Sequence, residues 1–226
     1  YYRDRSLNEW VQRGNDLLGT KELFGTSVDL SADGNRLVVG SWKQPGSVYV
    51  YEWQNGSDVW EQLGSTVTGR EWFDIFGHQV RISGNGNSII VGNDSSDQRM
   101  TGEAQVFTFV DGDWMQVGGD LEGRTAQDQF GSAVAISDDG TVVAVGGPFN
   151  ERNGYNAGHA RVYELVGDGW KAKGRDMKGA AAGDNFGYAI SLAENGLTVA
   201  VGARERLDTL AGARQGYIQV FEFDHT

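Results

Sequence analysis

Residues 128–148 read Asp-Gln-Phe-Gly-Ser-Ala-Val-Ala-Ile-Ser-Asp-Asp-Gly-Thr-Val-Val-Ala-Val-Gly-Gly-Pro. An alternating run of residues follows Phe130-Gly131, and a second apolar run ends at Gly146. Alternation with a period of two is typical of a half-buried strand. The Asp-Gly pair between the two runs supplies the positive φ that a tight turn requires. The stretch therefore predicts a β-hairpin.

The same pattern occurs four times along the chain. The Phe-Gly dipeptide recurs at intervals of 52, 54 and 56 residues, beginning at Phe24, Phe76, Phe130 and Phe186. A tryptophan that is followed by a glycine four residues later stays in phase with it, at Trp10, Trp60, Trp114 and Trp170. Two anchors in phase indicate an internal repeat. We expect one domain over residues 1–226, with repeats at about 10–59, 60–113, 114–169 and 170–226.

Each repeat predicts four short antiparallel strands. The alternating run gives the first strand, the apolar run the second, a further alternating run such as Val48–Trp53 the third, and the Trp segment the fourth. One such sheet cannot bury both of its faces, so the copies must stack. Radial stacking of four-stranded sheets is a β-propeller, which also protects strand edges. The prediction is an all-β propeller of four four-stranded blades.

The phase of the two ends suggests how such a ring would close. The chain begins with a fourth-type strand near Trp10 and ends with a third-type strand near Phe221. We therefore expect residues 8–13 to pair with residues 217–223 and complete the last blade. The alternative is an open fragment of a larger propeller. The start at Tyr1, without methionine, is interpreted as that of a mature product or of a segment of a longer polypeptide.

Composition narrows the classes of function. Hydrophobic residues make up 39% of the 226 residues, enough to bury a core, and the 34 glycines indicate many tight turns. The formal net charge of −12 disfavours nucleic acid and anionic lipid as partners. The chain has no cysteine, which excludes disulfides and thiolate chemistry. No apolar run approaches the 18 or so residues of a transmembrane helix.

The third repeat resembles an FG-GAP repeat, the kind found in the propeller of integrin α subunits. Phe130-Gly131 and Gly146-Gly147-Pro148 carry the resemblance, the second being similar to the Gly-Ala-Pro element of the family. The other copies keep Phe-Gly but depart at the second element, with Gly40-Ser41, Gly92-Asn93 and Gly202-Ala203-Arg204. The Trp-x-Gln-x-Gly lead-in resembles a variant common in large surface proteins of bacteria and algae. The resemblance implies a propeller, usually of seven blades, which is more than this chain can supply.

The family's calcium site is where the sequence departs most. Calcium-binding copies carry an acidic loop between the first two strands, because a hard cation needs six to eight oxygen ligands. Here that loop has shrunk to turns such as Ser31-Ala-Asp-Gly34. We therefore expect no metal and no cofactor, since the shortened hairpins do not support calcium.

Residues that recur in every repeat are interpreted as structural. An acidic residue precedes Phe-Gly at Asp74, Asp128 and Asp184, and it is expected to accept hydrogen bonds from turn amides rather than to form a carboxylate ring. The four repeat tryptophans and the four Phe-Gly phenylalanines are expected to pack between blades. Their regular placement gives them a role in building the blades.

Residues that break the repeat are the candidates for binding. Trp42 and Trp72 are aromatic residues outside the repeat pattern, and such residues are common at interfaces. The loops between second and third strands vary most, and loops on a rigid scaffold often carry recognition. They supply the remaining candidates, which are Asn150, Asn153 and Asn156 for a sugar or a cation, and Arg204 and Arg206 for an acidic partner.

Catalysis has little support in the sequence. His78, His159 and His225 occupy different parts of the repeat, and no Ser/His/Asp pattern or metal-ligand spacing is found. The leading hypothesis is a non-catalytic extracellular or cell-surface module for adhesion or binding, with protein or carbohydrate as its partner. One alternative is a structural subunit of a cell-surface or extracellular assembly. The other is the accessory propeller of a secreted hydrolase.

Overall fold

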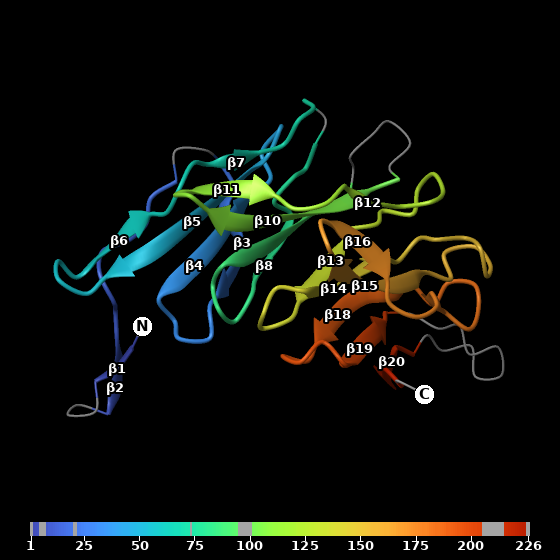
Figure 1. Ribbon diagram of the computed structural model, residues 1–226. Coiled ribbons are helices and arrows are strands. Elements are labelled where there is room, and N and C mark those ends of the chain that lie inside the picture. The colour runs from blue at the N-terminus through green and yellow to red at the C-terminus, as the bar shows by residue number, and fades with distance from the viewer. Residues whose placement is uncertain are drawn as a thin grey trace.

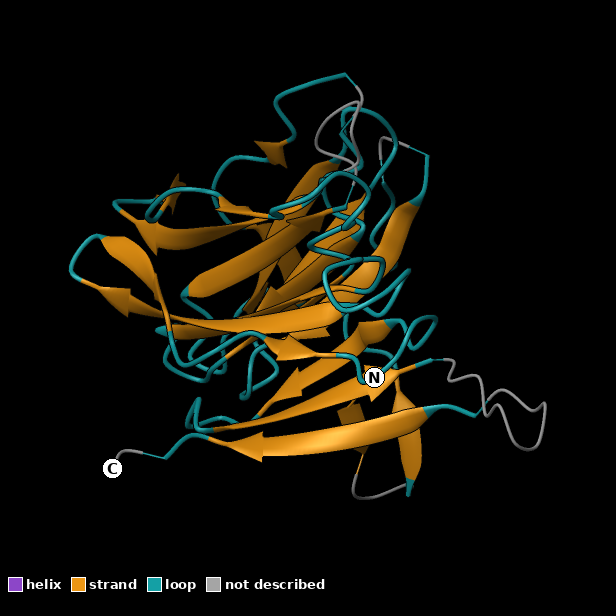
Figure 2. Ribbon diagram, turned by 90° about the vertical axis from the view of Figure 1, so that its right-hand side faces the viewer, coloured by secondary structure: helices purple, strands orange, loops and turns teal. Residues whose placement is uncertain are grey.

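The computed structural model describes residues 2–4, 8–19, 22–72, 74–94, 101–204 and 215–224. Every regular element in these ranges is a β-strand, so the predicted all-β class is confirmed. Figure 2 shows strands joined by loops throughout. Among the described residues, we find no helix that could cross a lipid bilayer.

Four antiparallel sheets correspond to the four predicted repeats, and we call them blades 1 to 4. In each blade the strands pair in chain order. Blade 1 contains β3 (Phe24–Leu30), β4 (Arg36–Ser41), β5 (Ser47–Gln54) and β6 (Val59–Gln62). Blade 2 contains β8 (Gln79–Ile82), β9 (Ser88–Asn93), β10 (Glu103–Val110) and β11 (Asp113–Gln116). Blade 3 contains β13 (Ala133–Ile136), β14 (Val142–Gly147), β15 (His159–Val166) and β16 (Gly169–Ala172), and blade 4 contains β18 (Phe186–Leu192), β19 (Thr198–Ala203) and β20 (Tyr217–Glu222).

Short strands join one blade to the next. After its fourth strand the chain returns to pair briefly with the start of the third strand, in β7 (Val67–Thr68), β12 (Leu121–Glu122) and β17 (Met177–Lys178). The chain then enters the first strand of the following blade.

The first hairpin of each blade is closed by the Asp-Gly or Asn-Gly turn that the sequence predicts. In blade 3, Gly140 has a φ of +78°, and Asp139 Oδ1 accepts hydrogen bonds from Ser137 Oγ and from the backbone N–H of Thr141, at 2.7 and 2.9 Å. The carboxylate is therefore engaged by its own turn. Backbone hydrogen bonds such as Asn85 N to Asp138 O link these turns from blade to blade.

The blades stack face to face in an arc, and the hydrophobic core lies between them (Figure 1). One cluster joins blades 1 and 2 through residues such as Val48 and Val80, a second joins blades 2 and 3, and a third joins blades 3 and 4. The first strands of adjacent blades contact one another along the inner edge of the arc. This radial order of blades is that of a β-propeller, so the predicted architecture is confirmed.

Adjacent blades approach so closely that a side chain would not fit between their backbones. The glycine near the end of each second strand faces the Phe-Gly of the following blade. A Cβ on Gly146 would overlap the carbonyl oxygen of Gly187, and the same holds for Gly92 against Gly131. Glycine is therefore needed at these positions by the packing of blades.

The predicted closure of the ring by the N-terminal strand is wrong for this structure. β2 (Glu9–Val11) pairs with β1 (Tyr2–Asp4), and within the described residues β20 pairs only with β19. Figure 1 shows β1 and β2 at the opposite end of the arc from β20. The hairpin partner is only a few residues away in the chain, so its closure costs less entropy than pairing across the molecule. Blade 4 thus has three strands in the part of the chain that the structure describes, and the arc is open.

Candidate functional site

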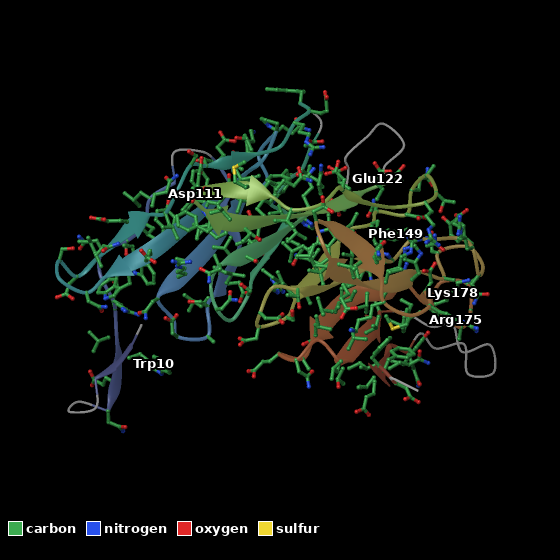
Figure 3. The ribbon with its side chains drawn as sticks, viewed as in Figure 1. Trp10, Asp111, Glu122, Phe149, Arg175 and Lys178 are labelled. Atoms are coloured by element: carbon green, nitrogen blue, oxygen red, sulfur yellow. The ribbon has the colours of Figure 1, made fainter. Side chains whose placement is uncertain are left out.

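The repeat tryptophans of blades 1 to 3 hold neighbouring segments together. Each indole Nε1–H donates to the backbone carbonyl of the residue directly before the recurring glycine of the previous repeat. The pairs are Trp60 with Arg13, Trp114 with Leu63 and Trp170 with Val117, at 2.8 to 3.0 Å. The glycine that follows each acceptor lies against the indole ring. Trp10 differs because 74% of its surface is exposed, and Figure 3 shows it on the N-terminal hairpin, away from the blades.

The phenylalanines of the Phe-Gly pairs lie between blades in three of the four copies, and the exception is Phe24, which packs on Tyr49 and Tyr51 of its own blade. Phe76, Phe130 and Phe186 are fully buried, and Phe24 is half-buried, with its ring edge against Tyr49. The acidic residues in front of them bind turn amides. Asp128 accepts the backbone N–H groups of Arg124 and Thr125, both at 3.1 Å, and Asp74 accepts that of Glu71 at 2.9 Å.

Asp184 has the same position in front of blade 4. Its carboxylate accepts the backbone N–H groups of Ala180 and Ala181 and the hydroxyl of Tyr217, the last at 2.6 Å. The three acidic side chains are buried. They fix the segments that lead into the first strands.

The connection between β14 and β15 uses its asparagines internally. Asn150 is buried and donates to Asp128 Oδ1 at 2.8 Å, while Asn153 donates to the carbonyl of Gly179 at 2.6 Å. Asn156 has a φ of +51° and its carbonyl accepts the N–H of Asn185. These side chains and backbone groups shape the loop, which packs on the segment leading into blade 4.

Two kinds of connection lie on the same side of the arc because the strands are antiparallel. They are the loops between second and third strands and the segments that lead into the first strands, and we call this side the loop face. The turns of the first hairpins lie on the opposite side, toward the lower centre of Figure 1. Sequence candidates Trp42, Trp72 and Arg204 all belong to the loop face, and Arg206 lies outside the described residues.

A group of four side chains gathers on the loop face where the first strands begin. We call Trp42, His78, Asp94 and Ser132 the inner-rim cluster. The ring edge of Trp42 meets His78, with ring centroids 6.2 Å apart. His78 Nδ1 lies 3.7 Å from Asp94 Oδ2, and Ser132 Oγ donates to the same oxygen at 3.2 Å. Three blades therefore contribute to one polar group.

The inner-rim cluster contains buried polar atoms that are available to a ligand. Burial raises the pKa of Asp94, although His78 and the hydroxyl of Ser132 act in the opposite direction. His78 Nδ1 and Asp94 Oδ1 are buried, and within the described ranges they have no hydrogen-bond partner. A buried polar atom without a partner costs free energy, so both atoms favour contact with a water molecule or with a polar group of a ligand.

The order of the three groups does not suit nucleophilic catalysis. A catalytic serine needs a base within hydrogen-bond reach, with the carboxylate behind that base. Here the hydroxyl of Ser132 donates to Asp94 and to the carbonyl of Gln129, so the carboxylate stands between serine and histidine. In the part of the chain that the structure describes, no three His, Cys, Asp or Glu side chains converge on a possible metal site.

Large aromatic side chains stand exposed on the loop face. Trp72 is 68% exposed and Tyr155 is 71% exposed. Tyr188 is 44% exposed, and the guanidinium of Arg204 lies 4.6 Å from the centre of its ring. Trp72 and Tyr155 lie in connections whose backbone N–H groups donate to the buried side chains of Asp74 and Asn150. The loop face thus presents aromatic surface on a fixed framework.

Sequence reasoning missed Asp94, Ser132 and Tyr155 and gave His78 no role. A signal for the first two was available. The residue after Phe-Gly is different in every repeat, being Thr26, His78, Ser132 or Tyr188. The second residue after the glycine of the second strand also differs, being Trp42, Asp94, Pro148 or Arg204. Tyr155 is an aromatic residue outside the repeat, the criterion that selected Trp72.

Comparison with known families now bears on the repeat. Residues 122–163 match the family model described as FG-GAP repeat. This segment is an FG-GAP repeat. The FG-GAP match extends from β12 through the hairpin quoted at the outset to β15, and it confirms the resemblance inferred from Phe130-Gly131. None of the curated proteins compared with the chain matches it.

Solved structures similar to this one include other proteins with β-propeller domains. One, from Bacteroides uniformis, is described as a candidate 6-phosphogluconolactonase, with 12% identity and a TM-score of 0.54 over 87% of this chain and 55% of that chain. Hydrazine synthase from Kuenenia stuttgartiensis has 11% identity and a TM-score of 0.56, covering 88% and 51%. The Cps50 (Swd1) β-propeller domain from Myceliophteria thermophila has 12% identity and a TM-score of 0.53, covering 88% and 53%. At such identity the likeness concerns the fold alone, and the chain spans about half the length of each of these structures.

Proposed function

We propose that this chain is a non-catalytic binding module that recognises a protein or carbohydrate partner through its loop face, at a cell surface or in an extracellular setting. The observation that carries the proposal is the exposure of Trp72 and Tyr155, at 68% and 71%. The tryptophans at the repeat position in blades 1 to 3 pack against the neighbouring segments of the chain. These two aromatic residues have no such packing role.

Exposed aromatic residues on a rigid loop are well suited to recognition. Tryptophan and tyrosine provide a large contact area at a low cost in side-chain entropy, and they dominate the energetics of many interfaces. Asp74 accepts a backbone hydrogen bond from Glu71, the neighbour of Trp72, and Asn153 holds the Tyr155 loop on Gly179. Because these hydrogen bonds hold the segments beside both aromatic residues, we expect binding to lose little further entropy.

The inner-rim cluster adds polar contacts to this surface. Asp94 Oδ1 is an acceptor and His78 Nδ1 is either donor or acceptor, depending on its tautomer. Neither atom has a hydrogen-bond partner among the residues that the structure describes. A hydroxyl or amide group of a bound partner would satisfy both atoms, with Trp42 beside them as apolar surface. Chemistry of this kind is common to sugars and to polypeptide backbones.

Binding should be tested with a printed glycan array and with an array of purified extracellular protein domains. We expect the wild-type chain to bind a set of related probes, and Trp72→Ala and Tyr155→Ala each to weaken that binding at least tenfold. Met115→Ala is the matched control, since Met115 is 58% exposed but belongs to the fourth strand of blade 2. Binding that withstands both aromatic substitutions, or no binding on either array, would refute the proposal.

A further inference from the structure

The outer face of blade 4 has the form of a blade interface without its partner. In blades 1 to 3 the glycine near the end of the second strand has no room for a Cβ, because the next Phe-Gly lies against it. The equivalent residue of blade 4 is Gly202, and there a Cβ would meet only Ala189 of the same blade, at 3.5 Å. The place that a Phe-Gly backbone occupies in the other blades is open.

Apolar side chains on the same face are exposed where their equivalents are buried. Ile218 and Val220 of β20 are 73% and 66% exposed. Val48 and Val50 take the same positions in blade 1, where blade 2 covers them to 0% and 1% exposure. The face of blade 4 therefore keeps the composition of an interior surface.

Blade 1 presents the complementary half at the other end of the arc. Gly25 has no atom within 4 Å of an added Cβ, whereas the equivalent Gly131 and Gly187 lie against carbonyl oxygens of the preceding blade. Val28 and Leu30 of β3 are 55% and 52% exposed. Their equivalents in blade 2, Val80 and Ile82, are 0% and 5% exposed, because blade 1 covers them.

A groove beside β20 marks the place of a missing fourth strand. It is lined by residues that include Lys173, Gly174, Arg175, Met177, Phe221 and Phe223. The equivalents of Gly174 are Gly14, Gly64 and Gly118, and each lies against the indole ring of a repeat tryptophan in blade 1, 2 or 3. The nearest atoms to a Cβ on Gly174 belong to Phe223 instead, at 3.8 Å. The groove therefore corresponds to the site that a repeat tryptophan fills beside the other glycines. Trp10 is the repeat tryptophan that does not fill such a site in this structure.

The register of the N-terminal hairpin agrees with this position. β1 pairs with β2 as a third strand pairs with a fourth, with Arg3 opposite Trp10 where blade 1 has Trp53 opposite Trp60. By the same register, a β2 strand placed beside β20 would bring Val11 opposite Glu222. β20 would then take the place of β1.

We propose that the two ends of the arc are the two halves of a single interface, and that two copies of this chain associate head to tail through it. In each contact, Phe24-Gly25 of one copy packs on Gly202 of the other, and the β2 strand of the first completes blade 4 of the second, with Trp10 in the groove. A second copy is the occupant that fits because the same chain carries both halves. Two such contacts join two copies into one closed ring of eight blades, a number within the usual range for propellers.

The molar mass of the chain in solution tests this proposal directly. Sedimentation velocity and light scattering should give twice the 24.6 kDa of the chain at micromolar concentration. Gly202→Ala should abolish the pair, because the added methyl group would overlap the docked Phe-Gly backbone while having room in the isolated chain. Trp10→Ala should raise the dissociation constant at least tenfold.

Controls separate loss of association from loss of fold. Gly56→Ala, with no atom near an added Cβ, and Trp72→Ala, at an exposed residue outside the contact, should leave the mass unchanged. Ile218→Asp is a second substitution in the exposed face, and circular dichroism should show that it and Gly202→Ala keep the β-sheet signal of the wild type. A wild-type monomer up to 100-fold above micromolar concentration, a Gly202→Ala dimer, or a mass that grows without limit would each overturn the closed pair.

Discussion

At the scale of single residues, the interior of blade 3 contains charged and titratable groups. Arg161 is 2% exposed, pairs with Asp176 at 3.2 Å and lies over the ring of Phe130. His159 is 1% exposed beside it. Burial and, second, the charge of Arg161 lower the pKa of His159 to about 4. The histidine is therefore neutral in the folded protein at physiological pH.

This burial predicts a dependence of stability on pH. The histidine of the unfolded chain takes up a proton near its ordinary pKa of 6.5, but the folded one resists until about 4. Unfolding therefore becomes more favourable as the pH falls through this window, and at full extent the linkage is worth about 3 kcal/mol. Urea denaturation at pH 7.5 and 4.5 should show a smaller loss of unfolding free energy for His159→Gln than for the wild type. Parallel losses in the two proteins would contradict this account.

Residues outside the repeat limit what the sequence predicts at this scale. The acidic residue before Phe-Gly recurs, and its backbone contacts at Asp128 are those expected of a turn acceptor. The inner-rim cluster comes from three repeats, with Trp42 from the first, His78 and Asp94 from the second and Ser132 from the third. Their approach depends on how the blades are rotated about the axis of the arc. No single-repeat pattern encodes that rotation. Asn150 was a ligand candidate, but its partner Asp128 lies in a segment that only the fold brings near.

At the scale of elements, the contact between blades is a backbone contact as much as a side-chain one. The Phe-Gly anchor and the Asp-Gly turn were sufficient to predict the strands, because both have local conformational reasons. The need for glycine at the end of the second strand has a different origin. It comes from the carbonyl of the next Phe-Gly, which is about 40 residues away in the chain.

This backbone contact predicts that alanine substitutions at two glycines have different effects on the free energy of unfolding. Gly146→Ala should lower the free energy of unfolding by about 2–3 kcal/mol, since the methyl group would overlap the Gly187 carbonyl and force the blades apart. Gly56→Ala makes the same chemical change at a turn with open space, so its midpoint in urea should match that of the wild type. Equal midpoints for the two variants would show that blades 3 and 4 do not pack as described.

At the scale of the whole molecule, four blades form an open arc. Strand phase in the sequence predicted that a fourth-type strand near Trp10 and a third-type strand near Phe221 could pair. The same strand phase also fits the pairing of β2 with β1. Val11 lies opposite Tyr2 in that hairpin, and it would lie opposite Glu222 if β2 were placed beside β20. Sequence periodicity gives the register of a strand and not the identity of its partner. The partner is chosen by distance along the chain and by the curvature of the stack.

The openness of the arc is tested most directly by a pair of engineered cysteines in this chain, which has none of its own. Val11→Cys with Glu222→Cys places two thiols opposite each other only if β2 pairs with β20, since a disulfide requires Cα atoms about 4.4–6.8 Å apart. Under oxidising conditions, at concentrations where the chain is monomeric, we predict two free thiols by mass spectrometry. Complete formation of an intramolecular disulfide would contradict the open arc and restore a closed ring of four blades.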